Sequence, residues 1–223
     1  MKQMKQMKQN KILNKVNNFF DDYSKEFDSI YDDKKNNFLN NIINKLLRKS
    51  MFGRYMLTLN EVLKNKNKKK ILDIGCGSGR YCKKIASYGH YIRGLDVSSK
   101  MINIAKQYNK SFINKNVSLE VIDYLNFKSN YKFDYAVLMG FFDYIDQPYR
   151  IFKKLKIDTK IVLASFPKKY HWLTPQRAIR YKLNNCPLFF YTKNEIVTLM
   201  KKVGVNNFTI KNNDREYFLI CEF

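Results

Sequence analysis

The stretch ILDIGCGSGRY, residues 71–81, joins an apolar run to a helix-like segment through three glycines at alternate positions. Glycine has no Cβ and adopts positive φ readily, so such a loop can turn sharply and let its backbone approach a ligand. A dinucleotide loop reads G-x-G-x-x-G, and Arg80 stands where its third glycine would be. Asp73, just before the loop, would repel a pyrophosphate but attract a positively charged ligand. The stretch therefore predicts a strand, a nucleotide-cofactor loop and a helix, but disfavours pyrophosphate binding.

Acidic residues accompany three further segments of strand character. Asp96 follows residues 91–95 and stands 96 − 75 = 21 residues after the first glycine of the loop, near the spacing of about 20 expected for a βαβ unit. An acid at this place can accept hydrogen bonds from ribose hydroxyls. Asp123 follows the run 117–122, and Asp134 lies at the start of the apolar run 133–139. Four acids in register favour a cofactor site over four unrelated surface carboxylates.

This arrangement resembles motif I and the later acidic positions of the class I S-adenosylmethionine-dependent methyltransferases. The family's first motif is an acid, any residue and then G-x-G-x-G, and residues 73–79 match it completely. The resemblance covers roughly residue 69 to the C-terminus. It implies that S-adenosylmethionine is the cofactor, that Asp96 binds its ribose and that Asp123 takes its adenine amino group. The cofactor-binding residues expected from it are Asp73, Gly75, Cys76, Gly77, Gly79, Asp96, Val97, Asp123, Tyr124, Met139 and Gly140, together with Arg54, which could reach the methionine carboxylate.

Strand-like and helix-like segments alternate from residue 69 onward. Strands are predicted near residues 70–74, 91–95, 117–122, 133–139 and 160–165, then a helix after Lys193 and two strands at 208–210 and 216–222. Such alternation predicts a parallel, doubly wound sheet. The last two strands resemble the closing hairpin of the methyltransferase fold. The predicted class is α/β: a Rossmann-like, doubly wound, mostly parallel seven-stranded sheet with a C-terminal antiparallel hairpin and N-terminal helices.

The 223 residues are expected to form one cofactor domain preceded by helices. Residues 1–9 repeat Met-Lys-Gln and predict a disordered tail. Residues 10–63 predict a helical lid, because helices placed there often close over the cofactor in methyltransferases of small molecules. Residues 64–223 are expected to form the S-adenosylmethionine-binding domain. The apolar positions that recur at helical spacing in the lid are Phe19, Tyr23, Phe27, Ile30, Tyr31, Phe38, Ile42, Leu46, Tyr55, Leu59 and Val62.

The chain is strongly basic, with 42 lysines and arginines against 19 acids and a formal charge of +23. Clustered basic residues would indicate a nucleic-acid or anionic-membrane partner. Here they are scattered among many asparagines, and the dense run 64–70 is read as a linker, so nucleic-acid binding is not expected. The sequence contains no apolar run of about 18 residues, so no transmembrane segment is predicted. The four cysteines lack paired spacing, so no metal is expected. The expected location is the cytoplasm.

Substrate-binding residues are expected after strands four and five, because ligands of such sheets lie at the carboxyl ends of the strands. Phe141 and Tyr144 follow strand four, and many relatives have a histidine where Tyr144 stands, so a histidine base there is in doubt and the phenol could orient an acceptor instead. Residues 166–191 form an insertion that is predicted to cover the substrate. The alternative is a packed aromatic subdomain with surface arginines. The substrate residues predicted in the insertion are Trp172, Arg177, Arg180 and Tyr191, with the two arginines clamping an acidic group.

The sequence thus predicts an S-adenosylmethionine-dependent methyltransferase that O-methylates a small, amphipathic or ring-bearing acceptor with an acidic group. The organisation is loosely similar to methyltransferases of tetrapyrrole and quinone biosynthesis. His171 is the preferred general base because its ordinary pKa lies near the working pH, and Tyr144 is the second catalytic candidate. Two alternatives stay open: an RNA methyltransferase, favoured only by charge and lacking an N/D-P-P-Y/F motif after strand four, and a non-catalytic cofactor-binding protein. The acceptor's identity and the oligomeric state are not determined by these residues.

Overall fold

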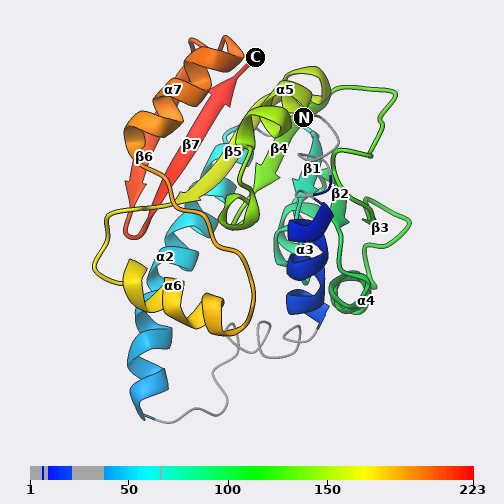
Figure 1. The fold of residues 1–223 in the computed structure, drawn as a ribbon. Helices are drawn as coiled ribbons and strands as arrows, with labels where there is room; N and C mark the ends of the chain where they lie inside the picture. The colour runs from blue at the N-terminus through cyan, green and yellow to red at the C-terminus, as the bar shows by residue number, and fades with distance from the viewer. Residues whose placement is uncertain (1–6, 8–9, 22–37, 66) are drawn as a thin grey trace.

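The computed structural model describes residues 7, 10–21, 38–65 and 67–223, with the backbone alone for 38–49 (Figure 1). Its centre is a seven-stranded sheet in the order β3-β2-β1-β4-β5-β7-β6. β1 to β5 pair in parallel, and β7 pairs antiparallel with both β5 and β6. The predicted fold class is therefore confirmed. The strands are β1 (Lys70–Ile74), β2 (Tyr91–Asp96), β3 (Val117–Val121), β4 (Phe133–Leu138), β5 (Thr159–Pro167), β6 (Phe208–Asn213) and β7 (Glu216–Glu222).

Helices cover both faces of the sheet. On one face α2 (Phe38–Val62) and α3 (Arg80–Ser87) bury Leu59, Val62 and Ile85 against β1 and β4. On the other, α5 (Pro148–Asp158) and α7 (Lys193–Val203) bury a second cluster that includes Phe152 and Met200. The chain order places α4 (Ser99–Tyr108) between β2 and β3. The sheet is thus doubly wound, and β1 and β4 are buried on both faces.

The insertion after β5 is helical in part. It contains α6 (Thr174–Leu183), which lies beyond the carboxyl ends of the strands. The inner side of α6 packs on the helical segment 10–21, where Val16 contacts Tyr181 and Cys186. Asp21 Oδ1 accepts a hydrogen bond from Ser98 Oγ (2.6 Å) at the start of α4. The segment 10–21 therefore spans from the insertion to the second βα connection.

Part of the predicted N-terminal organisation falls outside the described residues. The tail 1–9 does so except for residue 7, as do Tyr23, Phe27, Ile30 and Tyr31. For Phe38, Ile42 and Leu46 only the helical backbone is described. Within the described ranges, no helix combines the length and the apolar character that crossing a bilayer requires.

Candidate functional site

A cavity of about 730 Å³ lies at the carboxyl ends of the parallel strands, within the roughly 300–1,000 Å³ typical of small-molecule sites. Its walls come from the ends of β1 to β4, from the segment 10–21, from α2 and α6, and from the first residues of β7. The structure brings together at this cavity Arg54, Asp73, Gly75, Cys76, Gly77, Asp96, Val97, Asp123, Tyr124, Met139 and Gly140, all of them predicted cofactor-binding residues. Phe141, Tyr144, Arg177 and Arg180 of the predicted catalytic and substrate sets also line it.

The glycine loop follows β1 and has positive φ at each of its glycines, 71° at Gly75, 53° at Gly77 and 74° at Gly79. A Cβ on Gly75 would lie 3.0 Å from the Phe141 ring, and one on Gly77 would meet nothing within 4 Å. A Cβ on Gly79 would lie 2.6 Å from the Asn109 amide. Gly79 does not line the cavity, and its lack of a side chain allows α3 to pack closely against α4. At Gly77, by contrast, the backbone faces open space.

Asp96 ends β2 and holds the glycine loop in place. Its Oδ2 accepts the Gly77 backbone N–H (2.9 Å) and its Oδ1 accepts the Ser98 backbone N–H (2.9 Å). Burial raises the pKa of Asp96, and the backbone amides of Ser98, Gly77 and Val97 offset part of that rise. Each carboxylate oxygen can accept a second bond, so Asp96 can hold the loop and still receive a ligand hydroxyl.

Asp73 is buried beneath the same loop. The Cys82 thiol donates to its Oδ2 at 3.3 Å. Burial raises the pKa of Asp73 from 3.8 to about 7, and the bond from Cys82 offsets only part of that rise. A carboxylate with so little solvation is favoured in its charged form by a nearby cation.

Asp123 and Tyr124 follow β3 at the far side of the loop. Asp123 Oδ1 accepts the Leu125 backbone N–H at 3.0 Å, which fixes the turn and leaves Oδ2 for other partners. The Tyr124 hydroxyl donates to Asp158 Oδ2 at 2.9 Å. The Tyr124 hydroxyl is therefore held in the core by Asp158. The ring and backbone of Tyr124 remain to contact a ligand.

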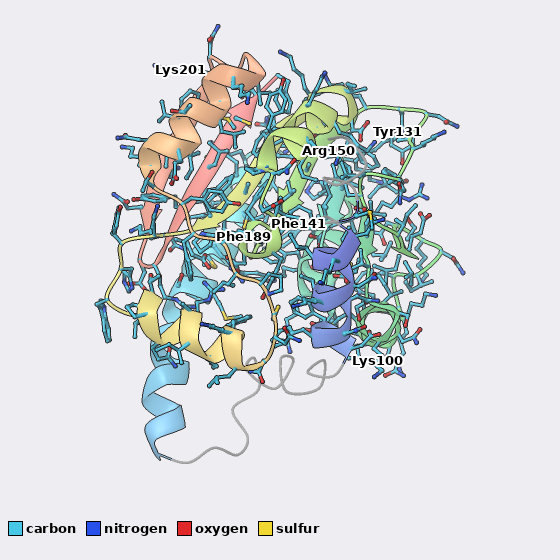
Figure 2. All side chains as sticks on the ribbon, in the orientation of Figure 1. Lys100, Tyr131, Phe141, Arg150, Phe189 and Lys201 are labelled. Atoms are coloured by element: carbon cyan, nitrogen blue, oxygen red, sulfur yellow. The ribbon has the colours of Figure 1, made fainter. Side chains whose placement is uncertain are left out.

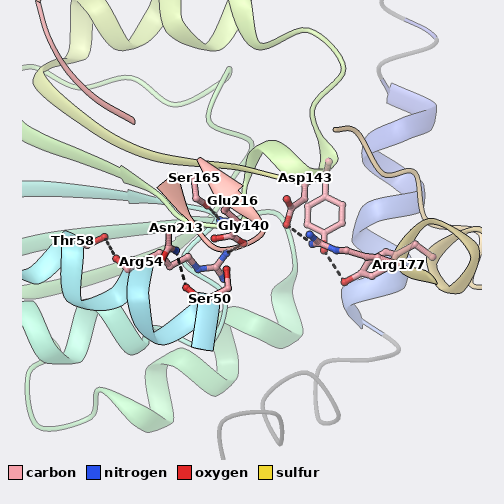
Figure 3. A network of polar contacts seen from close by, with 11 residues as sticks. Ser50, Arg54, Thr58, Gly140, Asp143, Ser165, Arg177, Asn213 and Glu216 are labelled. Atoms are coloured by element: carbon pink, nitrogen blue, oxygen red, sulfur yellow. Dashed lines mark hydrogen bonds and ion pairs between the residues drawn. The ribbon is translucent and has the colours of Figure 1, made fainter. Parts of the chain in front are cut away.

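Arg54 reaches the cavity from α2 and joins a buried polar network (Figure 3). Its Nη1 donates to Glu216 Oε1 at 2.8 Å, and both side chains are almost fully buried. A Cβ on Gly140 would lie 3.4 Å from this guanidinium, while the Gly140 N–H donates to Ser165 Oγ (2.8 Å). Arg54 thus reaches van der Waals distance of Gly140 at the end of β4, and it is the φ of 75° that favours glycine at this position.

Arg177 of α6 pairs with Asp143, its Nη2 lying 2.8 Å from Asp143 Oδ2 (Figure 3). Both side chains are buried, so each compensates the charge of the other. The Tyr144 hydroxyl lies 3.3 Å from that of Tyr181, and burial raises the pKa of Tyr144 well above its ordinary value. Tyr144 therefore stays protonated at neutral pH, with its proton donated to Tyr181 Oη, and its own oxygen can accept a hydrogen bond from the cavity.

Three predicted residues lie elsewhere. His171 is not among the cavity-lining residues; its Nδ1 accepts the Leu173 N–H (3.2 Å) and its Nε2 lies 3.8 Å from Asp214 Oδ1. Trp172 is 70% exposed. Tyr191 donates to the Ile145 carbonyl and packs edge-on against Phe166. The geometry therefore does not bring the predicted base to the predicted cofactor site.

Sequence reasoning did not select Asp143, Arg215 or Glu216, which also line the cavity. Glu216 Oε2 and Arg215 Nε are buried and have no hydrogen-bond partner among the described residues. Arg215 and Glu216 follow a turn at the start of β7, where charged residues usually face solvent. Only the antiparallel pairing of β7 with β5, which sets Glu216 opposite Pro167, brings them to the strand ends.

Known proteins resemble parts of this chain. A family model described as a methyltransferase domain matches residues 65–204. The ubiquinone biosynthesis O-methyltransferase of Coxiella burnetii is 30% identical over 86 residues, which are 38% of this chain and 36% of that protein. The one from Glaesserella parasuis is 28% identical over 94 residues, 40% and 39% of the two chains. The matched stretch therefore spans little more than a third of these relatives.

Solved structures extend the similarity to the whole fold. Magnesium protoporphyrin IX methyltransferase from Synechocystis PCC 6803, crystallised with S-adenosylhomocysteine, superposes with a TM-score of 0.70 at 19% identity, covering 95% of this chain and 98% of that one. Phosphoethanolamine N-methyltransferase 2 from Haemonchus contortus, crystallised with S-adenosyl-L-methionine, gives 0.64 at 15% identity, covering 76% and 52%. At these identities the structures show a shared fold.

Proposed function

The chain belongs to the methyltransferase-domain family, and on that basis we propose that it transfers the methyl group of S-adenosylmethionine to a small molecule. The observation that carries the proposal is the convergence of Asp73, Asp96 and Asp123 with the glycine loop at one side of a single cavity. The other side of that cavity is built by Tyr144 and by α6 of the insertion. A cofactor and an acceptor can therefore share one space.

The residues present fit this cofactor. Asp96 has lone pairs left for ribose hydroxyls, and the backbone at Gly77 is open to close approach. Asp73 gains from a neighbouring positive charge, which the ammonium and sulfonium of the cofactor carry. Arg54 is the proposed partner of the methionine carboxylate, and Asp123 that of the adenine amino group. An Arg54→Ala protein with unchanged cofactor affinity would remove Arg54 from this set.

We assign the acceptor to the side of the cavity formed by Tyr144, Phe141 and α6. Arg177 is already neutralised by Asp143. Arg180 also lines the cavity and, within the described residues, its guanidinium contacts the Tyr181 ring (5.3 Å to the centroid) without an ion pair. Arg180 rather than Arg177 is therefore the proposed partner of an acidic group on the acceptor.

The proposed reaction is an O-methylation. Bound S-adenosylmethionine would supply a methyl group on a positively charged sulfur, which is already activated for transfer. The contribution of the protein is then mainly to hold the acceptor oxygen in line with that methyl. Tyr144 donates its proton to Tyr181, and its oxygen can orient the acceptor by accepting a hydrogen bond from the acceptor hydroxyl. His171 takes no part in this scheme, because it lies outside the cavity lining.

Residues 10–63 act in this proposal as the lid of a domain formed by residues 64–223. Val16 packs on Tyr181 of the insertion, and Phe20 lies edge-on to Tyr144 at 5.2 Å between ring centroids. Val16→Asp would place a charge in this contact and should raise KM for the acceptor more than Kd for the cofactor. Equal effects on the two constants would argue against a lid that serves the acceptor.

The test of the function is transfer of a labelled methyl group. Purified protein is incubated with methyl-labelled S-adenosylmethionine and a cell extract, and the RNA, protein and small-molecule fractions are separated. We expect label in small molecules, and loss of that label with Asp96→Asn. Glu120→Gln is the matched control, since Glu120 lies on β3 beside Arg93 and outside the cavity.

Label in RNA would refute the proposed acceptor class. Cofactor binding without label in any fraction would support a non-catalytic binding protein instead. Label that persists in small molecules with Asp96→Asn would mean that the activity does not depend on the proposed site.

A further inference from the structure

The outer side of α6 and the turn before it carry four large apolar side chains that face solvent. Tyr170 is 80% exposed, Trp172 70%, Ile179 62% and Leu183 82%. Ile179 and Leu183 stand four residues apart on a helix, so they share one face. The inner side of α6 is used differently, because Tyr181 packs on Val16 and Arg177 pairs with Asp143. We name Tyr170, Trp172, Ile179 and Leu183 the insertion patch.

Charge within the insertion itself has a single sign, although Asp214 of the β6–β7 turn lies 3.8 Å from His171 Nε2, next to Tyr170 and Trp172. No Asp or Glu occurs between Asp158 and Glu195, a stretch that contains the whole insertion. Lys169 and Lys182 are exposed beside the patch residues, and Lys169 Nζ lies 6.0 Å from the centre of the Tyr170 ring. Lys169 and Lys182 therefore lie next to an exposed apolar surface.

Exposed aromatic and branched apolar side chains among lysines, on a short amphipathic helix, match the chemistry of a lipid–water interface. The apolar chains enter the acyl boundary, tryptophan and tyrosine lie at the headgroup level, and the basic residues meet anionic headgroups. We infer that the insertion patch docks the protein on the surface of an anionic lipid bilayer. Because Arg180 of the same helix lines the cavity, docking places an edge of the cavity at the bilayer.

Trp172 is the only tryptophan of the chain, so its fluorescence reports on this patch alone. The full chain is titrated with vesicles of phosphatidylcholine and with vesicles of phosphatidylcholine and phosphatidylglycerol, without cofactor. We expect a blue shift of the emission and weaker quenching by acrylamide with the anionic vesicles only. Binding that causes no change in Trp172 emission would overturn the inference, because another surface would then be in contact.

Two matched pairs of variants separate this patch from the general positive charge. Ile179→Ser/Leu183→Ser should weaken partitioning into anionic vesicles by at least about tenfold. Val121→Ser/Ile157→Ser should not, although Val121 on β3 is 49% exposed and Ile157 on α5 73%. Lys169→Gln/Lys182→Gln should weaken binding by about fivefold for each lysine. Lys201→Gln/Lys202→Gln removes the same charge from two exposed positions on α7, which lies at the other end of the molecule from α6 (Figures 1 and 2).

Equal losses in the patch variants and their controls would show binding by net charge alone and would refute the proposal. A second result would also refute the proposal: the wild type is a dimer that does not bind vesicles, and Ile179→Ser/Leu183→Ser is a monomer. The patch would then contact a second copy of the chain. Thermal unfolding of each variant checks that the fold is kept, as expected for exposed positions. None of these readouts requires methyl transfer, so their outcome is independent of the proposed function.

Discussion

Asp73 illustrates how burial sets the properties of a single residue. The sequence places it before the glycine loop, and the structure buries it there, where among the described residues only the Cys82 thiol donates to its carboxylate. Its pKa of about 7 means that the folded protein retains a proton which the unfolded chain, with an ordinary value of 3.8, has released. Ionisation of Asp73 is therefore less favourable in the folded protein than in the unfolded chain.

This shift predicts the pH dependence of folding. Between pH 4 and 7 the folded state binds more protons at Asp73 than the unfolded state, so the free energy of unfolding falls as pH rises, by an amount on the order of 4 kcal/mol. Asp73→Asn should remove that part of the fall. Urea unfolding at pH 4.5 and 7.5 measures it, and an identical fall in wild type and variant would contradict the assigned pKa.

The pair Arg177–Asp143 predicts an asymmetric response to mutation. Asp143→Ala leaves the buried Arg177 guanidinium without its carboxylate and should lower the free energy of unfolding by about 3–5 kcal/mol. Asp143→Ala combined with Arg177→Met removes both charges and should cost clearly less than the single change. A double-mutant cycle in urea measures the difference; additive costs would show that the two charges do not depend on each other.

At the scale of elements, local signals fix the helix ends. The Thr192 hydroxyl accepts the Glu195 N–H and the Glu195 carboxylate accepts the Thr192 N–H, a complete capping box that starts α7. Gly204 ends the helix with φ 74°. A helix after Lys193 was predicted from the sequence without reference to this cap.

This cap makes a measurable prediction. Thr192→Ala should lower the free energy of unfolding by about 1 kcal/mol, because the N-terminal N–H of α7 loses its acceptor. Thr198→Ala, at an exposed position inside the same helix, should be neutral or slightly stabilising, since alanine is the better helix former. Chemical denaturation of both variants tests this, and equal costs would mean that the cap contributes nothing specific.

Strand bounds were predictable to within two or three residues, since period and turn residues are local. β5 extends to Pro167 and β6 to Asn213, beyond their predicted ends. These extensions come from pairing with β7, which no local pattern encodes. The insertion was predicted as a covering segment, but its helix α6 has one inward and one exposed apolar face, and the sequence alone could not say which face turned inward.

For the whole molecule, the convergence of residues around the glycine loop could be predicted from the sequence, and the long-range contacts elsewhere in the cavity could not. Asp73, Gly77 and Asp96 follow strands in a fixed order, so spacing alone brings them together. Arg54 and Glu216 are 162 residues apart, and their contact depends on the complete sheet and on α2. His171 was selected for its chemistry, and chemistry gave no information on where its ring would lie.

The central claim is that the cavity beside the glycine loop binds S-adenosylmethionine through Asp96. Isothermal titration calorimetry of the cofactor with wild-type protein, Asp96→Asn and Glu120→Gln tests it most directly. We expect saturable binding by wild type, a loss of about 10- to 100-fold in affinity for Asp96→Asn, and a change within about twofold for the control Glu120→Gln, whose half-buried side chain lies outside the cavity. Absence of binding by wild type, or equal affinities for all three proteins, would contradict the claim.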